Sequence, residues 1–188
     1  MNSSDREGLR RAITARLHPA ISLIDLSGEP HWEISEIRNP LSFFEHLPAL
    51  MPTGSVLYVE GTNIAPAPAT FYSDYLCSDP VPIVSDILFP KPQIFHLAFS
   101  DALCAGLTKL ANGRPSEDLF HHIKGYQDRS VIFTFHDAFS GVLRVTREQP
   151  ESVIFAFCNA LNARYKFAAT EPPAMDALAG FLKLLGEP

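Results

Sequence analysis

Proline is concentrated in the middle of this chain, and that concentration limits which secondary structure can form there. Six of the sixteen prolines lie between Pro66 and Pro92. Each proline removes a backbone N–H donor and fixes φ, so this density predicts neither a helix nor an inner strand. The stretch is also too apolar for disorder. Residues 61–92 are therefore predicted to form an irregular but ordered insertion, of a length often found in lids and binding segments.

Outside this insertion, hydrophobic periodicity predicts a single globular domain over residues 1–188. Helices are predicted over residues 5–17, 40–50, 100–112, 115–125 and 151–161 and from about residue 170, and strands over residues 21–25, 31–35, 55–60, 93–99, 130–136, 142–147 and 164–167. Helices mixed with strands, without regular βαβ alternation, indicate an α+β fold. We expect a mixed, mainly antiparallel sheet with helices packed on it.

The clearest tertiary signal is a β-hairpin formed by residues 130–136 and 142–147, with a short turn between them. The first of these strands is apolar on both faces, so we expect it at the centre of the sheet. Residues 164–167 alternate basic and aromatic side chains, which is typical of an edge strand whose charges discourage further pairing.

Charge and cysteine usage restrict the partners and the compartment. The formal charge of −6 and the pI near 5.6 argue against nucleic acid as a partner. The N-terminus lacks the apolar core of a signal peptide, and no apolar run approaches the ~18 residues that span a bilayer. Cys77, Cys104 and Cys158 have no CxxC spacing, which predicts neither a disulfide framework nor a zinc site. These features predict a cytoplasmic protein that does not bind a membrane.

Motifs for phosphate binding, a nucleophile elbow or zinc hydrolysis are absent, so no cofactor and no metal are predicted. Three polar residues are the candidates for a site. His136 ends the central strand, where a histidine can act as a general base near neutral pH. Glu60 ends another strand beside Gly61, while His96 lies in an apolar strand and fits a core histidine as well. Convergence of these three residues on one pocket would favour an enzyme.

Phe71, Tyr72 and Tyr75 form the main candidate for a binding surface, because exposed aromatic residues recur at protein interfaces. The alternative is that these rings fasten the insertion to the body of the domain. The fourteen phenylalanines indicate either an aromatic-rich core or a ring-lined cavity.

These observations favour a non-enzymatic protein-interaction module. We expect it to bind a protein partner, or itself as a homodimer, through the Pro-rich segment and the nearby sheet edge. The alternatives are a small hydrolase-like enzyme, with His136 or His96 as the general base beneath the insertion, and a small-molecule binding protein with an aromatic-lined cavity.

Overall fold

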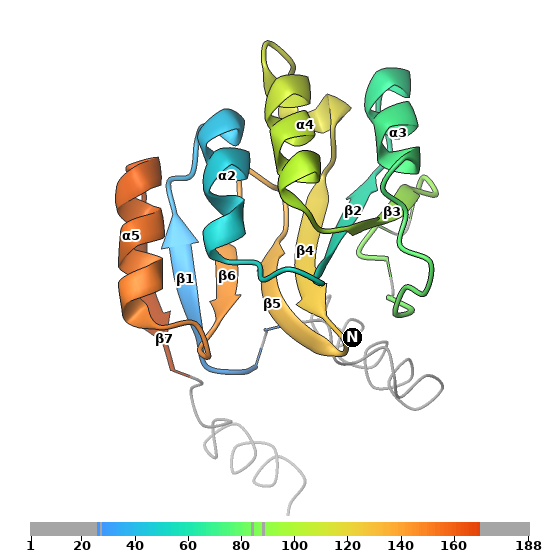
Figure 1. Cartoon of the computed structure of the whole chain (residues 1–188). Coiled ribbons are helices and arrows are strands. Elements are labelled where there is room, and N and C mark those ends of the chain that lie inside the picture. Colours follow the sequence, from blue (N-terminus) through green and yellow to red (C-terminus); the bar gives the residue numbers. More distant parts are fainter. Residues whose placement is uncertain (1–25, 27, 84, 88, 170–188) are drawn as a thin grey trace, which may run out of the picture.

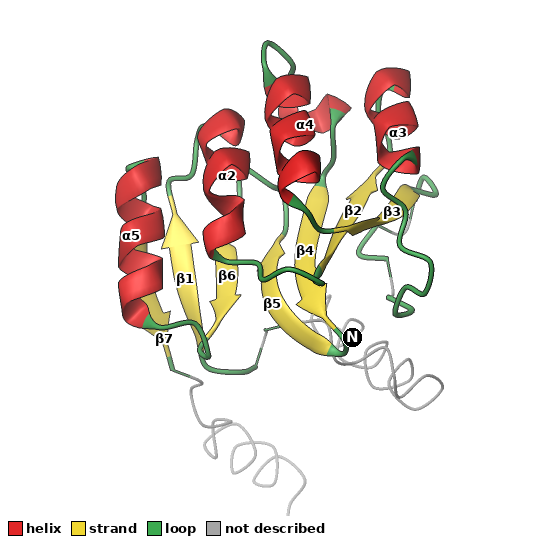
Figure 2. Cartoon of the chain, in the orientation of Figure 1, coloured by secondary structure: helices red, strands yellow, loops and turns green. Residues whose placement is uncertain are grey.

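One antiparallel sheet of seven strands organises the chain, and helices line up along one of its faces (Figures 1 and 2). The structure is a computed structural model that describes residues 26, 28–83, 85–87 and 89–169. The strand order is β3-β2-β4-β5-β6-β1-β7. The strands are β1 (His31–Ser35), β2 (Val56–Gly61), β3 (Gln93–Ala98), β4 (His122–Gln127), β5 (Ser130–Phe135), β6 (Leu143–Thr146) and β7 (Arg164–Ala168). The helices are α2 (Pro40–His46), α3 (Pro66–Ser73), α4 (Asp101–Ala111) and α5 (Glu151–Leu161), with short 3₁₀ turns at Leu47–Ala49 and Ser116–Asp118.

This arrangement confirms the predicted α+β class with helices packed on a mainly antiparallel sheet. The predicted hairpin is β5 paired with β6, and β5 is the middle strand of the seven. β7 is an edge strand, as its sequence indicated. The predicted elements at residues 5–17, 21–25 and from about 170 lie outside the described residues. Among the described residues, none of the helices combines the length and apolar character needed to cross a membrane.

Helix boundaries follow the capping residues. The Asn39 side chain accepts a hydrogen bond from the Leu41 N–H at 3.0 Å, and Pro40 opens α2, where its missing donor has no helical acceptor. Ser100 caps α4 by accepting from the Leu103 N–H at 3.2 Å. α5 ends at Asn162, whose φ of 52° is the left-handed conformation common after a helix.

The prediction that no helix forms among the prolines is wrong for residues 66–73, because α3 begins at Pro66. Pro66 and Pro68 both lie in its first turn, where backbone N–H groups have no intrahelical acceptor, so neither costs a hydrogen bond. Proline density excludes a helix only when the prolines lie beyond the first turn. The segment from residue 74 to the start of β3 has no helix among its described residues.

Two further predictions need correction. The helix predicted over residues 115–125 is a 3₁₀ turn followed by β4. The apolar residues of this segment fit the period of a helix and also that of a strand. Gly125, however, lies beneath Phe133, and a Cβ added at this glycine would come within 2.5 Å of that ring. The strand predicted as buried at residues 93–99 is β3, which is an edge strand with half of its residues exposed.

The register of the strands divides the sheet into an apolar face and a polar face. On the helix side, facing residues form an unbroken apolar row from β3 to β1: Phe95, Val59, Ile123, Phe135, Leu143 and Ile34. On the opposite side, a polar row crosses all seven strands: His96, Tyr58, Lys124, Thr134, Arg144, Glu33 and Lys166. The candidate site lies on this polar face.

Candidate functional site

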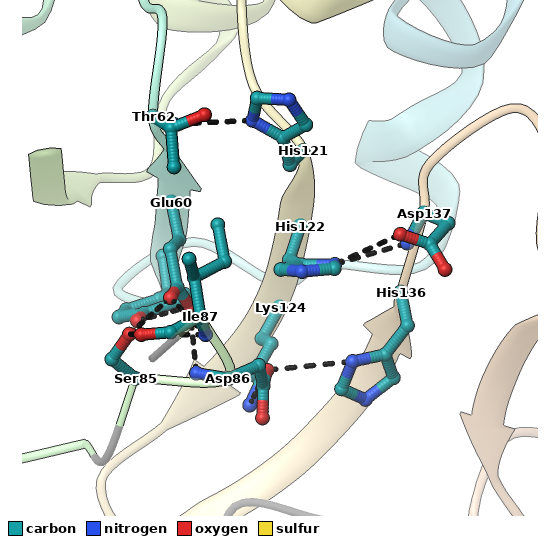
Figure 3. Close-up of polar contacts among 11 residues, drawn as sticks. Glu60, Thr62, Ser85, Asp86, Ile87, His121, His122, Lys124, His136 and Asp137 are labelled. Carbon is teal, nitrogen blue, oxygen red and sulfur yellow. Dashed lines mark hydrogen bonds and ion pairs between the residues drawn. The ribbon is translucent and has the colours of Figure 1, made fainter. Parts of the chain in front are cut away.

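A cluster of buried and half-buried polar groups lies on the polar face, where residues 85–87 of the Pro-rich segment cross β2 and β4 (Figure 3). The alternation of strand side chains places Tyr58 and Glu60 of β2 on this face, two residues apart, and Lys124 of β4 directly opposite Tyr58. The Pro-rich segment supplies Ser85 and Asp86. These residues come from three separate parts of the chain.

Glu60 is the centre of the cluster and is fully buried. The Tyr58 hydroxyl donates to Glu60 Oε2 at 2.7 Å, and the Ile87 N–H donates to Oε1 at 2.9 Å. The Asp86 N–H donates to Oε2 at 3.2 Å, and the Ser85 hydroxyl also donates to Oε1. A buried carboxylate needs such donors, since burial without them is costly. Glu60 therefore fastens residues 85–87 to the sheet.

Lys124 is the cation of the cluster, and its side chain is only 4 % exposed. Its Nζ lies 2.6 Å from Asp86 Oδ2 and 5.6 Å from the centroid of the Tyr58 ring. The carboxylate and the ring face together offset the cost of burying the ammonium group. Burial, together with the hydrogen bond to Glu60, raises the pKa of Tyr58 above its ordinary value, so this hydroxyl stays a donor.

His136 follows the last residue of β5 and joins the cluster through Asp86. Its Nδ1 lies 3.4 Å from Asp86 Oδ2, and both side chains are about one-third exposed, at 31 % and 30 %. The ring of His122 lies beside that of His136, with 5.5 Å between centroids. His122 Nδ1 accepts a hydrogen bond from the Asp137 N–H at 3.0 Å and lies 3.9 Å from Asp137 Oδ1. Asp86 thus contacts both a lysine and a histidine.

His96 lies on the same face but in a neighbouring aromatic cluster. Its Nδ1 is 2.9 Å from the Tyr126 hydroxyl, and its ring lies 5.2 Å from that of Tyr58. Burial lowers the pKa of His96 and raises the pKa of Tyr126 to about 12. Val81 and Ile83 of the Pro-rich segment pack against Tyr58 and Tyr126. The structure therefore brings Glu60 and His136 together around Asp86, while His96 lies on the far side of Tyr58.

Of the predicted binding surface of Phe71, Tyr72 and Tyr75, the structure excludes Tyr72 and leaves the other two rings partly exposed. Tyr72 is fully buried, and its hydroxyl donates to the Leu119 carbonyl at 3.1 Å. Phe71 packs directly over Gly106 of α4, and Tyr75 is half-buried against Phe71. These rings fasten α3 to the body of the domain, which was the alternative interpretation.

Three large apolar side chains in or beside the Pro-rich segment are exposed instead, and we call the edge that carries them the Pro-rich edge: Leu76, Phe89 and Ile94. Phe89 is 89 % exposed, which is the largest value among the exposed large hydrophobic residues of the described chain. Residues 75–77 run beside the outer edge of β3, where the Cys77 N–H donates to the His96 carbonyl at 2.7 Å. The Pro-rich edge thus lies at the β3 end of the sheet, next to the polar cluster.

Sequence reasoning missed Lys124, Asp86, Tyr58, Ser85 and His122. An alternating interpretation of residues 122–127 would have placed Lys124 on a strand face opposite Ile123, but no local signal pairs Lys124 with Asp86.

Within the described residues, no group of three histidine, cysteine or acidic side chains has a geometry suited to a metal ion. Comparison with protein-family models, curated proteins and solved structures gives no match to this chain.

Proposed function

We propose that this chain is a protein-interaction domain that binds a partner protein through the Pro-rich edge, with Phe89 as the central contact. The observation that carries the proposal is the 89 % exposure of this phenylalanine. A ring of this size gains most when it enters a pocket on a partner, and aromatic anchors of this kind dominate interface energies. Leu76 and Ile94 are also exposed and lie at the same β3 edge of the sheet, Leu76 beside that strand and Ile94 on it.

The polar cluster supports this proposal because it holds the base of the segment that carries Phe89. Glu60 accepts the backbone N–H groups of Asp86 and Ile87, and Lys124 binds the Asp86 carboxylate. Phe89 follows Ile87 by two residues and precedes Pro90 and Pro92, which restrict the backbone further. A contact presented from an anchored segment loses less conformational entropy on binding than one on a free loop.

The cysteines fit the predicted cytoplasmic setting of this interaction. Cys77, Cys104 and Cys158 are free thiols, and burial raises the pKa of Cys104 to about 12 and of Cys158 to about 11. Buried thiols of this kind are weakly reactive, and unpaired cysteines are typical of reducing compartments.

We expect Phe89→Ala to abolish partner capture while leaving the fold intact, because the side chain contributes little to the core. The measurement is quantitative affinity capture from the native lysate with wild-type and variant chains, with the partner then purified and its affinity measured. Val142→Ala is the matched control, since Val142 is an exposed apolar residue just before β6, away from both ends of the sheet. Retention of the same partner at equal affinity by Phe89→Ala would contradict the proposal.

A second candidate is hydrolytic chemistry with His136 as general base, and the contact that favours it is His136 Nδ1 to Asp86 Oδ2 at 3.4 Å. A carboxylate at one ring nitrogen orients the imidazole and supports proton transfer, as in acid–base dyads. Lys124 holds that carboxylate in place.

If this second candidate holds, His136→Gln and Asp86→Asn should each lower the rate by about a hundredfold or more. The measurement is a screen of activated carboxylic and phosphoric esters, followed by pH–rate profiles of the substrate that reacts. His46→Gln, a half-exposed histidine on α2, is the control. Equal rates for wild-type, His136→Gln and His46→Gln chains would exclude His136 as the base.

A further inference from the structure

A second surface, independent of the Pro-rich edge, lies at the opposite end of the sheet, where β7 is the edge strand and α5 covers it (Figures 1 and 2). Phe167 of β7 is 49 % exposed and Phe155 of α5 is 54 % exposed. β7 contains no proline and no bulge, and among the described residues β1 is its only paired neighbour. Within the described part of the chain, no strand pairs with its outer backbone groups, which are the kind of edge to which a further strand can be added.

Each basic side chain of β7 forms an exposed ion pair with a glutamate on or next to β1. Lys166 Nζ lies 2.9 Å from Glu33 Oε2, and Arg164 Nε lies 3.5 Å from Glu36 Oε2. The basic side chains project from the polar face, while Tyr165 and Phe167 project toward the helix side, where both contact Trp32. A strand added to β7 therefore meets alternating basic and aromatic positions.

These positions decide whether a second copy of β7 fits. In an antiparallel pair with twofold symmetry, the residue on the axis faces itself and its neighbours face each other across it. An axis at Tyr165 places Arg164 opposite the partner copy's lysine at position 166, and an axis at Lys166 places two lysines opposite each other. An axis at Phe167 places Lys166 opposite an alanine, the residue at position 168. Of these three registers, only the third avoids directly opposed like charges, which destabilise strand pairs.

The third register also places the exposed Phe167 rings of the two copies opposite each other. Cross-strand aromatic pairs of this kind stabilise antiparallel sheets. The pairing keeps both copies of α5 on the same side of the joined sheet and brings them next to each other. The exposed face of α5 carries Ser152, Phe155, Ala156, Asn159 and Ala160, and its one acidic residue, Glu151, accepts a hydrogen bond from the Tyr165 hydroxyl at 3.2 Å.

We propose that two copies of this chain pair through β7 in antiparallel orientation, with the twofold axis at Phe167, and form one continuous sheet with adjacent α5 helices. The charge pattern of β7 disfavours an axis at Tyr165 or Lys166, the exposed Phe167 rings favour an axis at Phe167, and the exposed α5 face with Phe155 extends the contact beyond the strand. The Pro-rich edges then lie at the two far ends of the joined sheet, so the dimer presents two separate binding surfaces.

The test is sedimentation equilibrium of the full chain with two substitutions at one position. Ala168→Lys places a lysine opposite Lys166 of the second copy, and Ala168→Glu places a carboxylate there. Each substitution acts twice in a twofold dimer, so we expect Ala168→Lys to weaken the dimer about tenfold and Ala168→Glu to strengthen it. Gln93→Lys and Gln93→Glu, on the exposed edge of β3, are the matched controls and should change nothing.

Disulfide trapping tests the register separately. Under oxidation, Phe167→Cys should form a covalent dimer, because Cα atoms facing each other across an antiparallel pair are about 4.5–5.5 Å apart. Lys166→Cys should not, because its counterpart is displaced diagonally by about 7–8 Å or more. Circular dichroism checks that each variant is folded.

Three results would overturn the proposal. A monomeric wild-type chain would leave residues 170–188 of the same chain, or a different protein, as the occupant of this surface. Equal shifts for Ala168→Lys and Ala168→Glu would show that the dimer forms elsewhere. Covalent trapping by Lys166→Cys rather than Phe167→Cys would exclude the register.

Discussion

Replacing Glu60 by glutamine is expected to lower the free energy of unfolding by about 3 kcal/mol. The carboxylate is fully buried and accepts from two hydroxyl groups and two backbone N–H groups, so it meets donors only. Glutamine keeps the shape but replaces one oxygen by an NH₂ group, which points its own hydrogens at donors. The two donors at the replaced oxygen, one hydroxyl and one backbone N–H, then lose their acceptor, and each unsatisfied donor costs about 1–3 kcal/mol.

Urea denaturation followed by circular dichroism measures this loss. Glu45→Gln is the matched control, because Glu45 is an exposed residue of α2 and its replacement should change the stability by less than about 0.5 kcal/mol. Hydrogen exchange of the Asp86 and Ile87 amides gives a local readout, since these two N–H groups should exchange faster in Glu60→Gln. Equal stability of the two variants, with both amides still protected, would show that Glu60 does not anchor the segment.

This anchor links stability to the proposed function. If residues 85–87 leave the sheet, Phe89 stays on the chain but loses its fixed position, so partner affinity should fall through entropy rather than through a lost contact. Glu60→Gln is thus expected to weaken binding less than Phe89→Ala does. In this proposal the polar cluster holds the segment in place, and the Pro-rich edge makes the contact with the partner.

Local patterns in the sequence predicted the elements whose signals are short in range. The Asn39 and Ser100 caps located α2 and α4, and the β5–β6 hairpin was visible from its alternating strands and short turn. These features depend on neighbours within a few residues, so one sequence carries them in full.

The helix predicted over residues 115–125 was wrong because its apolar residues fit the period of a helix and also that of a strand. Leu119, Phe120 and Ile123 match a helix face, yet Ile123 faces the core as a strand residue. Gly125 decides between the two, because its missing side chain leaves room for the Phe133 ring from the next strand. That requirement is a tertiary contact, which sequence periodicity does not contain.

The candidate site was predicted only in part for the same reason. Glu60 and His136 were identified because each ends a strand, where side chains often serve a site. Asp86 joins them across the fold, 26 residues from Glu60 along the chain, and lies in a segment whose path no periodic pattern describes. Lys124 lay in a predicted helix, which hid its position opposite Tyr58. Polar pairs of this kind depend on the register between neighbouring strands. That register is known only once the strand order of the sheet is known.

Phe43→Ala is expected to lower the free energy of unfolding by about 3–5 kcal/mol, the range for deleting a phenylalanine from a packed core. Phe43 of α2 is fully buried, and its ring contacts five other phenylalanines at centroid distances from 5.4 to 6.4 Å. Those rings are Phe44, Phe133, Phe135, Phe139 and Phe157, which belong to α2, β5, α5 and the turn after β5. The substitution opens a cavity where two helices meet the central strand, and edge-to-face contacts are lost with it.

The same substitution at Phe89 provides the comparison, because it deletes the same atoms from an almost fully exposed site. Phe89→Ala should change the free energy of unfolding by no more than about 0.5 kcal/mol, whereas Phe43→Ala should shift the urea midpoint strongly. Phe43→Leu, which fills part of the space, should fall between them. If Phe89→Ala destabilised the chain as much as Phe43→Ala, Phe89 would be a packing residue and the interaction proposal would lose its central contact. A stable Phe89→Ala chain that no longer binds its partner would separate the two roles of phenylalanine in this fold.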